Sequence, residues 1–144
     1  MKYRGYVRND PYYFLLHLVE FALAITVCAL YGVDVDRARR DRRYPSDEWV
    51  YAVVVGGVSA TTAVLYCFAF VRWSSFAWVS HAVLCIMWAV LSGIFGQKYV
   101  HVDPHGNHDL ERMRIALWVV FASTALWFVG FLLHFIAWRR HRYY

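Results

Sequence analysis

Four stretches of about twenty mostly apolar residues, separated by short polar segments, constrain the fold of this sequence more than any other feature. They run over residues 12–31, 49–71, 77–95 and 115–138. Every Lys and Arg lies outside them, and Glu20 is the only acidic residue inside. Each stretch is long enough to cross the hydrocarbon core of a bilayer as a helix. Because a charge at mid-bilayer costs about 2.5 to 3.5 kcal/mol, this partition predicts four transmembrane helices.

The connections between these stretches are short and polar. We expect Gly32 to end the first helix, and Pro45-Ser46-Asp47-Glu48 is typical of the start of the second. Residues 72–76 form a tight turn, and residues 97–114 form the third loop. Loops of this length join antiparallel neighbours. The sequence therefore predicts an all-α membrane protein, a single antiparallel four-transmembrane-helix bundle over residues 1–144.

The charge of the chain is consistent with a membrane protein. Lys and Arg number 15 against 10 for Asp and Glu. Basic residues beside transmembrane helices usually face anionic lipid headgroups, so the expected partners are membrane lipids, with other membrane proteins or further copies of the chain as an alternative, and no nucleic acid. The two predicted sides carry seven and eight basic residues, so charge alone does not set the orientation.

The second apolar stretch is rich in small residues. Helices in lipid associate by close packing, and small residues four positions apart allow it. These residues form a candidate helix-packing face, which is expected to join helices within the bundle, with an oligomer interface as the less favoured alternative: Gly56, Gly57, Ser59, Ala60 and Ala63.

Polar residues recur at matching depth in the four predicted helices. Because the helices alternate in direction, His17, His81, His134 and Tyr66 all lie about 6 to 8 Å from the side that carries both termini, with Glu20 nearer 12 Å. An ionisable group inside a membrane is a functional hypothesis by default, here a proton-sensitive or ligand-binding cluster. The competing interpretation, which we favour, is a layer of interhelical hydrogen bonds with a structural role.

The third loop contains further histidines. His101, His105 and His108 precede Asp109, and zinc does bind imidazole and carboxylate groups. Their spacing matches no standard site, and Pro104 and Gly106 interrupt any helix that would align them. A solvated polar loop is therefore favoured, and no metal ligand is assigned. The expected first loop spans residues 32–48. Its arginine-rich run, residues 37–43, is a candidate for contact with anionic headgroups, although its interleaved aspartate also fits a solvated loop.

Several short motifs resemble fungal MARVEL-domain proteins. In the C-terminal half they are Trp88, Phe95-Gly96 with Lys98-Tyr99, Asp103-Pro104 with Gly106, and Arg112-Met113 with Ala116 and Trp118. In the N-terminal half they are Leu30-Tyr31-Gly32-Val33-Asp34, Trp49-Val50-Tyr51-Ala52, Ser59-Ala60-Thr61 and Leu65-Tyr66. The resemblance implies a four-helix membrane domain with both termini in the cytosol, no catalytic residues, and a role in membrane apposition, vesicle trafficking or lateral membrane organisation.

Three functional hypotheses follow. The leading one is a non-enzymatic, MARVEL-like protein of membrane organisation or vesicle trafficking, in the plasma membrane or an endomembrane. The second is a small accessory subunit of a larger membrane complex, docked through the small-residue face. The third is a small transporter or membrane enzyme that uses the intramembrane His/Glu cluster. No nucleophile–base pair, phosphate-binding loop or cofactor motif is present in the sequence, so no catalytic residue and no cofactor are assigned.

Overall fold

A computed structural model describes residues 11–68, 75–102, 106 and 108–142. Within these residues the chain forms four α-helices and no strand: α1 (Pro11–Arg40), α2 (Asp47–Phe68), α3 (Ser75–Tyr99) and α4 (His108–Arg142). Each contains a segment that is long and apolar enough to cross a membrane. The predicted all-α four-helix bundle is confirmed, and the chain is a multi-pass membrane protein.

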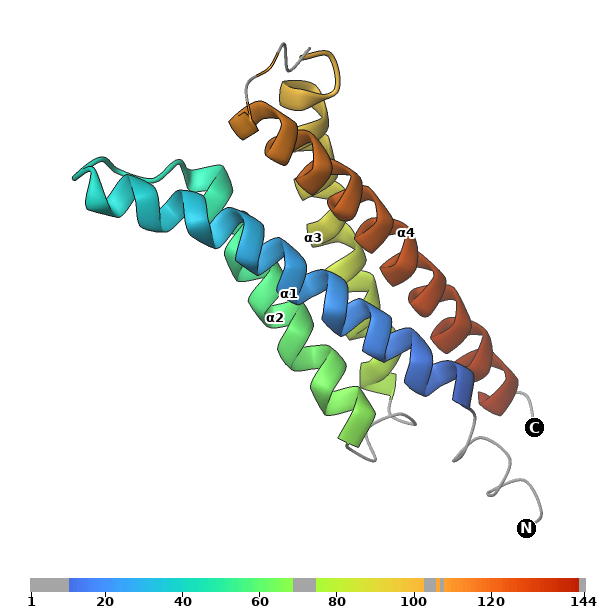
Figure 1. Ribbon diagram of the computed structural model, residues 1–144. Coiled ribbons are helices and arrows are strands. Elements are labelled where there is room, and N and C mark those ends of the chain that lie inside the picture. Colours follow the sequence, from blue (N-terminus) through green and yellow to red (C-terminus); the bar gives the residue numbers. More distant parts are fainter. Residues whose placement is uncertain (1–10, 69–74, 103–105, 107, 143–144) are drawn as a thin grey trace.

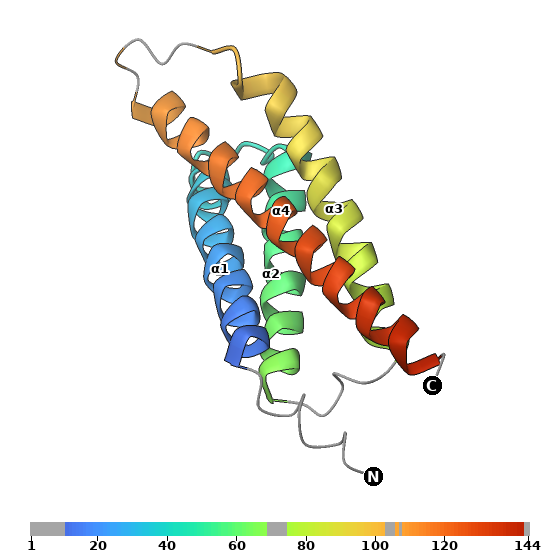
Figure 2. The ribbon, with the colours of Figure 1, turned by 90° about the vertical axis from the view of Figure 1, so that its right-hand side faces the viewer.

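Two antiparallel hairpins make up the bundle. Helix α1 packs mainly on α2, and α3 packs mainly on α4, while α1 also contacts α4. The first residues of α1 and the last residues of α4 lie at the same end (Figure 1). In the view turned by 90°, the α3–α4 hairpin crosses the α1–α2 hairpin at an angle (Figure 2). The last residues of α1 and α3 and the first residues of α2 and α4 therefore share the opposite end, which we call the loop end.

The helices extend beyond the apolar stretches that predicted them. Helix α1 does not stop at Gly32 but continues through the polar segment to Arg40, so most of the expected first loop is helical. A single glycine costs a helix only about 1 kcal/mol, and the Arg40–Asp36 ion pair at 2.9 Å supports the added turns. The helix ends where Arg42 adopts a positive φ of 53° and the Arg43 amide bonds back to the Ala38 carbonyl.

The start of α2 follows the predicted signal. Helix α2 begins at Asp47, and the carbonyl of Ser46 accepts hydrogen bonds from the amides of Trp49 and Val50 at 3.0 and 3.3 Å. Asp47 and Glu48 occupy its first turn, where carboxylates stabilise the positive end of the helix dipole. The expected second turn at 72–76 and the predicted end of the second helix at residue 71 lie largely outside the described residues.

Large side chains fill the centre of the bundle. The fully buried members of this core include Tyr31, Val55, Trp88, Phe95 and Trp127. Trp88 donates its indole N–H to the hydroxyl of Ser59 at 2.9 Å, so a hydrogen bond joins α3 to α2 inside the core. Apolar side chains such as Leu15, Ile86 and Trp118 point outward instead and are more than half exposed. An apolar exterior is what a bundle surrounded by lipid requires.

Candidate functional site

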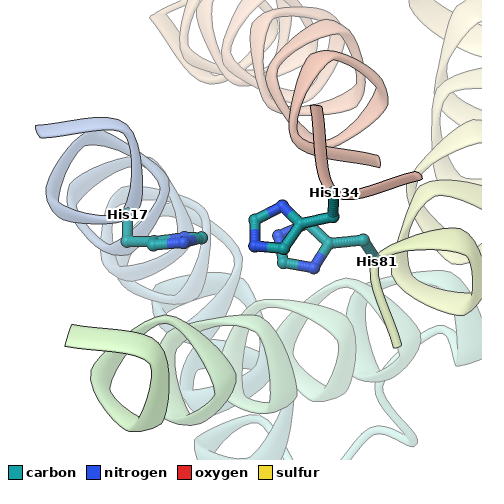
Figure 3. Close-up of side chains that lie close together, drawn as sticks. All are labelled: His17, His81 and His134. Atoms are coloured by element: carbon teal, nitrogen blue, oxygen red, sulfur yellow. The ribbon is translucent and has the colours of Figure 1, made fainter. Parts of the chain in front are cut away.

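The predicted polar layer assembles into one compact cluster of aromatic and imidazole rings. His81 of α3 and His134 of α4 stack with their ring centroids 4.3 Å apart. The ring of His17 in α1 lies 5.6 Å from that of His81 and 5.7 Å from that of His134. The three imidazoles converge from three helices on a common point (Figure 3). We call His17, Glu20, Tyr66, His81 and His134 the polar cluster.

Tyr66 brings the remaining helix, α2, into the cluster. Its ring stacks on His17 at 5.2 Å and lies 5.0 Å from His81. Its hydroxyl is hydrogen-bonded to the hydroxyl of Ser80. The sequence-predicted registration of these residues therefore places them in contact, with one ring from each helix.

All five members of the polar cluster are buried inside the protein. His17 and His81 are completely buried, and Glu20, Tyr66 and His134 are 1%, 3% and 6% exposed. One carboxyl oxygen of Glu20 has its partner on the same helix, because Oε2 lies 2.7 Å from Nδ1 of His17. The polar atoms thus face one another and not the surrounding lipid, as polar groups in membrane bundles do.

The hydrogen bonds of the three imidazoles follow one pattern. Nδ1 of His81 lies 3.0 Å from the carbonyl of Ala77, and Nδ1 of His134 lies 2.9 Å from the carbonyl of Gly130. A carbonyl only accepts, so in each contact Nδ1 is the donor, and a neutral ring that donates from Nδ1 has its lone pair on Nε2. His17 fits the same pattern, since its Nδ1 faces the Glu20 carboxyl group. The surroundings of Nδ1 are therefore alike in the three rings, with an oxygen atom within 3.0 Å of each.

Part of the polar cluster has no hydrogen-bond partner within the described protein. The buried atoms concerned are Nε2 of His17, Nε2 of His81 and Oε1 of Glu20. Buried polar atoms without partners are uncommon, and each requires an explanation such as a bound water or ion. One nitrogen from each of His17, His81 and His134 lies within 4.8 Å of the other two. The three nitrogens are therefore close enough to bind a small cation between them.

A glycine keeps the polar cluster compact. A Cβ at Gly130 would stand 2.9 Å from Cδ2 of His81 and 3.0 Å from Oε1 of Glu20. Both distances are shorter than ordinary carbon contacts. Sequence analysis did not single out Gly130 or Trp127, whose ring lies 5.0 Å from that of His81. The sequence signal that could have identified both residues was their position, one and two helical turns before His134 on the same helix.

The candidate helix-packing face lies mostly inside the bundle. Gly56, Ser59, Ala60 and Ala63 are buried, whereas Gly57 is exposed. A Cβ at Gly56 would stand 2.6 Å from Sγ of Cys28 and 3.0 Å from the Ala24 carbonyl, so α1 approaches α2 closely at this point. The buried members of this face thus pack within the chain, and only Gly57 of the set faces outward.

The histidines of the third loop do not come together in the described part of the chain. His101 and His108 are exposed, and His105 lies outside the described residues. His108 instead lies 3.9 Å from the carboxylate of Glu111. Among the described residues, the group with the proximity that a metal ion requires is His17, His81 and His134.

A cavity of about 440 Å³ opens at the loop end, between α1 and the start of α4. Its walls carry three arginines and three aspartates: Arg37, Arg43, Arg112, Asp34, Asp41 and Asp109. Tyr44, Trp49 and Tyr99 add aromatic surface.

Ion pairs join α1 to α4 across the cavity. Arg112 pairs with the buried Asp34, and Arg37 lies 3.2 Å from Asp109. The sequence pointed to the arginines of the first loop, but not to their partners on α4.

The fold and the polar cluster together define a multi-pass α-helical membrane protein with one carboxyl group and three imidazoles of this cluster in its interior. Comparison with protein-family models, with curated proteins and with solved structures found no match to this chain.

Proposed function

We propose that this protein is a non-enzymatic membrane protein that organises membranes or takes part in vesicle trafficking, as its resemblance to fungal MARVEL-domain proteins implies. The observation that carries the proposal is the loop-end cavity. It lies beyond the apolar stretches of α1 and α4, where a bilayer that covers those stretches would have its headgroups.

The chemistry of the cavity suits a zwitterionic phospholipid headgroup. Arginine pairs with phosphate oxygens, and aspartate pairs with an amine. The faces of Tyr44, Trp49 and Tyr99 are suited to a quaternary ammonium group through cation–π attraction. The three arginines and three aspartates balance in formal charge, which matches a headgroup that carries both signs.

The resemblance also implies an orientation. Both termini would lie in the cytosol of a cell whose plasma membrane or endomembranes hold the protein, and the loop end would face the outside or the lumen. The polar cluster, near the terminal end of the helices, would then lie nearer the cytosolic leaflet.

Lipid retention tests the headgroup contact. Arg37→Gln combined with Arg43→Gln removes two arginines of the cavity, while Arg39→Gln combined with Arg40→Gln removes two neighbours that do not line it. Native mass spectrometry of protein purified in mild detergent should detect less bound phospholipid in the first variant and unchanged amounts in the second. Equal retention in both variants would contradict the contact.

Fluorescence microscopy tests the cellular role. The tagged protein should move with vesicles or concentrate in membrane patches, and the Arg37/Arg43 variant should lose this distribution while the Arg39/Arg40 variant keeps it. A uniform distribution of the wild-type protein would contradict the proposal. Purification with one stoichiometric partner would favour the accessory subunit instead.

The polar cluster supports a second candidate, a small transporter or membrane enzyme. Three imidazoles and a carboxyl group buried between helices are of the kind found in proton and ion pathways. Liposomes that contain the purified protein test it directly. A pH-dependent flux that disappears in His81→Phe would favour this candidate over membrane organisation.

A further inference from the structure

We propose that His17, His81 and His134 form an intramembrane binding site for a divalent transition-metal ion, Zn²⁺ in the first instance. The inference goes beyond the proposed function and does not depend on it. It rests on the identity of the donor atoms, their spacing, the groups that hold each ring, and the space between them.

The donors are those that zinc prefers. Imidazole nitrogen is a common zinc ligand, and three histidines with a further open position form a well-known zinc arrangement. The three nitrogens lie within 4.8 Å of one another. Zinc–nitrogen bonds of about 2.1 Å in a tetrahedral site place the nitrogens roughly 3.4 Å apart. Binding therefore requires the three rings to turn toward one another until the nitrogens reach this spacing.

Each ring already has the support that metal-bound histidines show. A histidine that binds metal through Nε2 usually donates its Nδ1–H to a carboxylate or a backbone carbonyl, which fixes the tautomer and the ring orientation. Here Nδ1 of His17 faces Glu20, Nδ1 of His81 faces the Ala77 carbonyl, and Nδ1 of His134 faces the Gly130 carbonyl. A neutral ring that donates from Nδ1 carries its lone pair on Nε2, the atom through which such a histidine binds a metal ion.

A bound ion would also explain the buried atoms that lack partners. Nε2 of His17 and Nε2 of His81 are buried without a hydrogen-bond partner in the described protein. Leaving such an atom unsatisfied costs about 1 to 3 kcal/mol, whereas coordination satisfies it. A pure hydrogen-bond layer, the interpretation favoured from sequence, predicts partners for these atoms and therefore fits them less well.

Glu20 supplies charge and a candidate fourth ligand. Its Oε1 is buried and has no hydrogen-bond partner in the described protein. Oε1 of Glu20 and Nε2 of His81 lie 3.0 and 3.3 Å from the point that a Cβ of Gly130 would occupy. The missing side chain at Gly130 thus leaves room beside two donor atoms. In a medium of low dielectric constant, a carboxylate beside three neutral imidazoles offsets part of the charge of the ion.

Titration of Zn²⁺ into the metal-free protein in detergent, followed by calorimetry, tests the site. The wild-type protein should bind one ion per chain, and His81→Phe or His134→Phe should weaken binding at least about 100-fold, since each removes a ligand but keeps an aromatic ring. Glu20→Leu removes the acceptor of His17 Nδ1 and should weaken binding about 10- to 100-fold, the usual effect of losing a group that orients a ligand. The control is His101→Ala combined with His108→Ala, which removes the exposed loop histidines and should leave binding unchanged.

Co²⁺ gives a second measurement on the same variants. Its visible d–d absorption should have the intensity typical of tetrahedral nitrogen ligation in the wild-type and loop variants and should be lost in the ring variants. Thermal melting without metal checks that each variant is folded, and His17→Gln replaces any ring variant that is not. Absence of Zn²⁺ binding to the wild-type protein would overturn the proposal, as would binding that survives the ring variants or disappears with the loop histidines.

Discussion

Nδ1 of His17 lies 2.7 Å from Oε2 of Glu20, one turn further along α1, and both side chains are buried. The one acidic residue of the four apolar stretches therefore has its hydrogen-bond partner on its own helix. The other oxygen of the carboxyl group faces the space beside Gly130. Glu20 thus lies between His17 of α1 and the point where α3 and α4 meet.

Replacing Glu20 should reveal how much this pair stabilises the fold. In Glu20→Leu the Nδ1 atom of His17 loses its acceptor, so the free energy of unfolding should fall by about 1 to 3 kcal/mol. Glu20→Gln keeps an acceptor and should cost less. Thermal unfolding in detergent with a chelator present measures both, and Glu111→Leu, at an exposed position of α4, should change little. Wild-type stability in both Glu20 variants would show that the pair has no structural role.

Two adjacent glycines of α2 should respond differently to the same substitution. Gly56→Ala places a Cβ against Cys28 and the Ala24 backbone, so it should destabilise the protein by about 1 to 3 kcal/mol, as overpacking does. Gly57→Ala meets nothing within 4 Å and should be neutral or slightly stabilising. Melting temperatures compare the two variants. Similar values for both would mean that α1 and α2 are not as close as described.

The ion pair at the loop end should matter more than an exposed one. Asp34 is 5% exposed on its side chain and pairs with Arg112 of α4, so Asp34→Asn should lower the free energy of unfolding by about 1 to 3 kcal/mol. Asp36→Asn breaks the exposed Asp36–Arg40 pair within α1 and should cost less than about 0.5 kcal/mol. A double-mutant cycle with Arg112→Gln measures the coupling. A coupling energy near zero would contradict a connection between α1 and α4 through this pair.

The antiparallel arrangement makes a direct prediction about sidedness. With the native cysteines replaced by alanine, Tyr44→Cys and His108→Cys should react with a membrane-impermeant thiol reagent from one side of the membrane. Arg140→Cys, at the other end of α4, should react only from the opposite side. Sealed vesicles of known orientation provide the measurement. Labelling of all three positions from one side would rule out the described crossing of α4.

The bundle and the members of the polar cluster could be predicted from the sequence for a physical reason. Lipid excludes charge, so the boundaries of apolar stretches give the spans, and alternating direction fixes which residues share a depth. His17, Tyr66, His81 and His134 were therefore found from position alone. Depth does not specify the direction of a side chain, however, so the ring stacking and the partners of the ring nitrogens needed the structure.

Other features could not be predicted because they depend on contacts between distant segments. The continuation of α1 past Gly32 is supported by the pairing of the buried Asp34 with Arg112, 78 residues away. Similarly, the sequence could not tell that Gly56 faces α1 while Gly57 faces outward. The local signal at Ser46 predicted the start of α2 correctly, because the start of a helix depends on nearby backbone hydrogen bonds. The signal at Gly32 predicted a helix end and was wrong, because a contact with a distant segment stabilises the continued helix.

The distribution of the polar cluster over both hairpins has a consequence for biogenesis. His17, Glu20 and Tyr66 belong to the first hairpin, whereas His81 and His134 belong to the second. During synthesis the first hairpin enters the bilayer before the second exists, and in that interval the bond between His17 and Glu20 is the means of shielding the carboxyl group from lipid. A nascent chain arrested after α2 would expose the polar residues of the first hairpin without their partners. Cellular quality control could recognise this exposed polar surface and so distinguish the arrested chain from the finished protein.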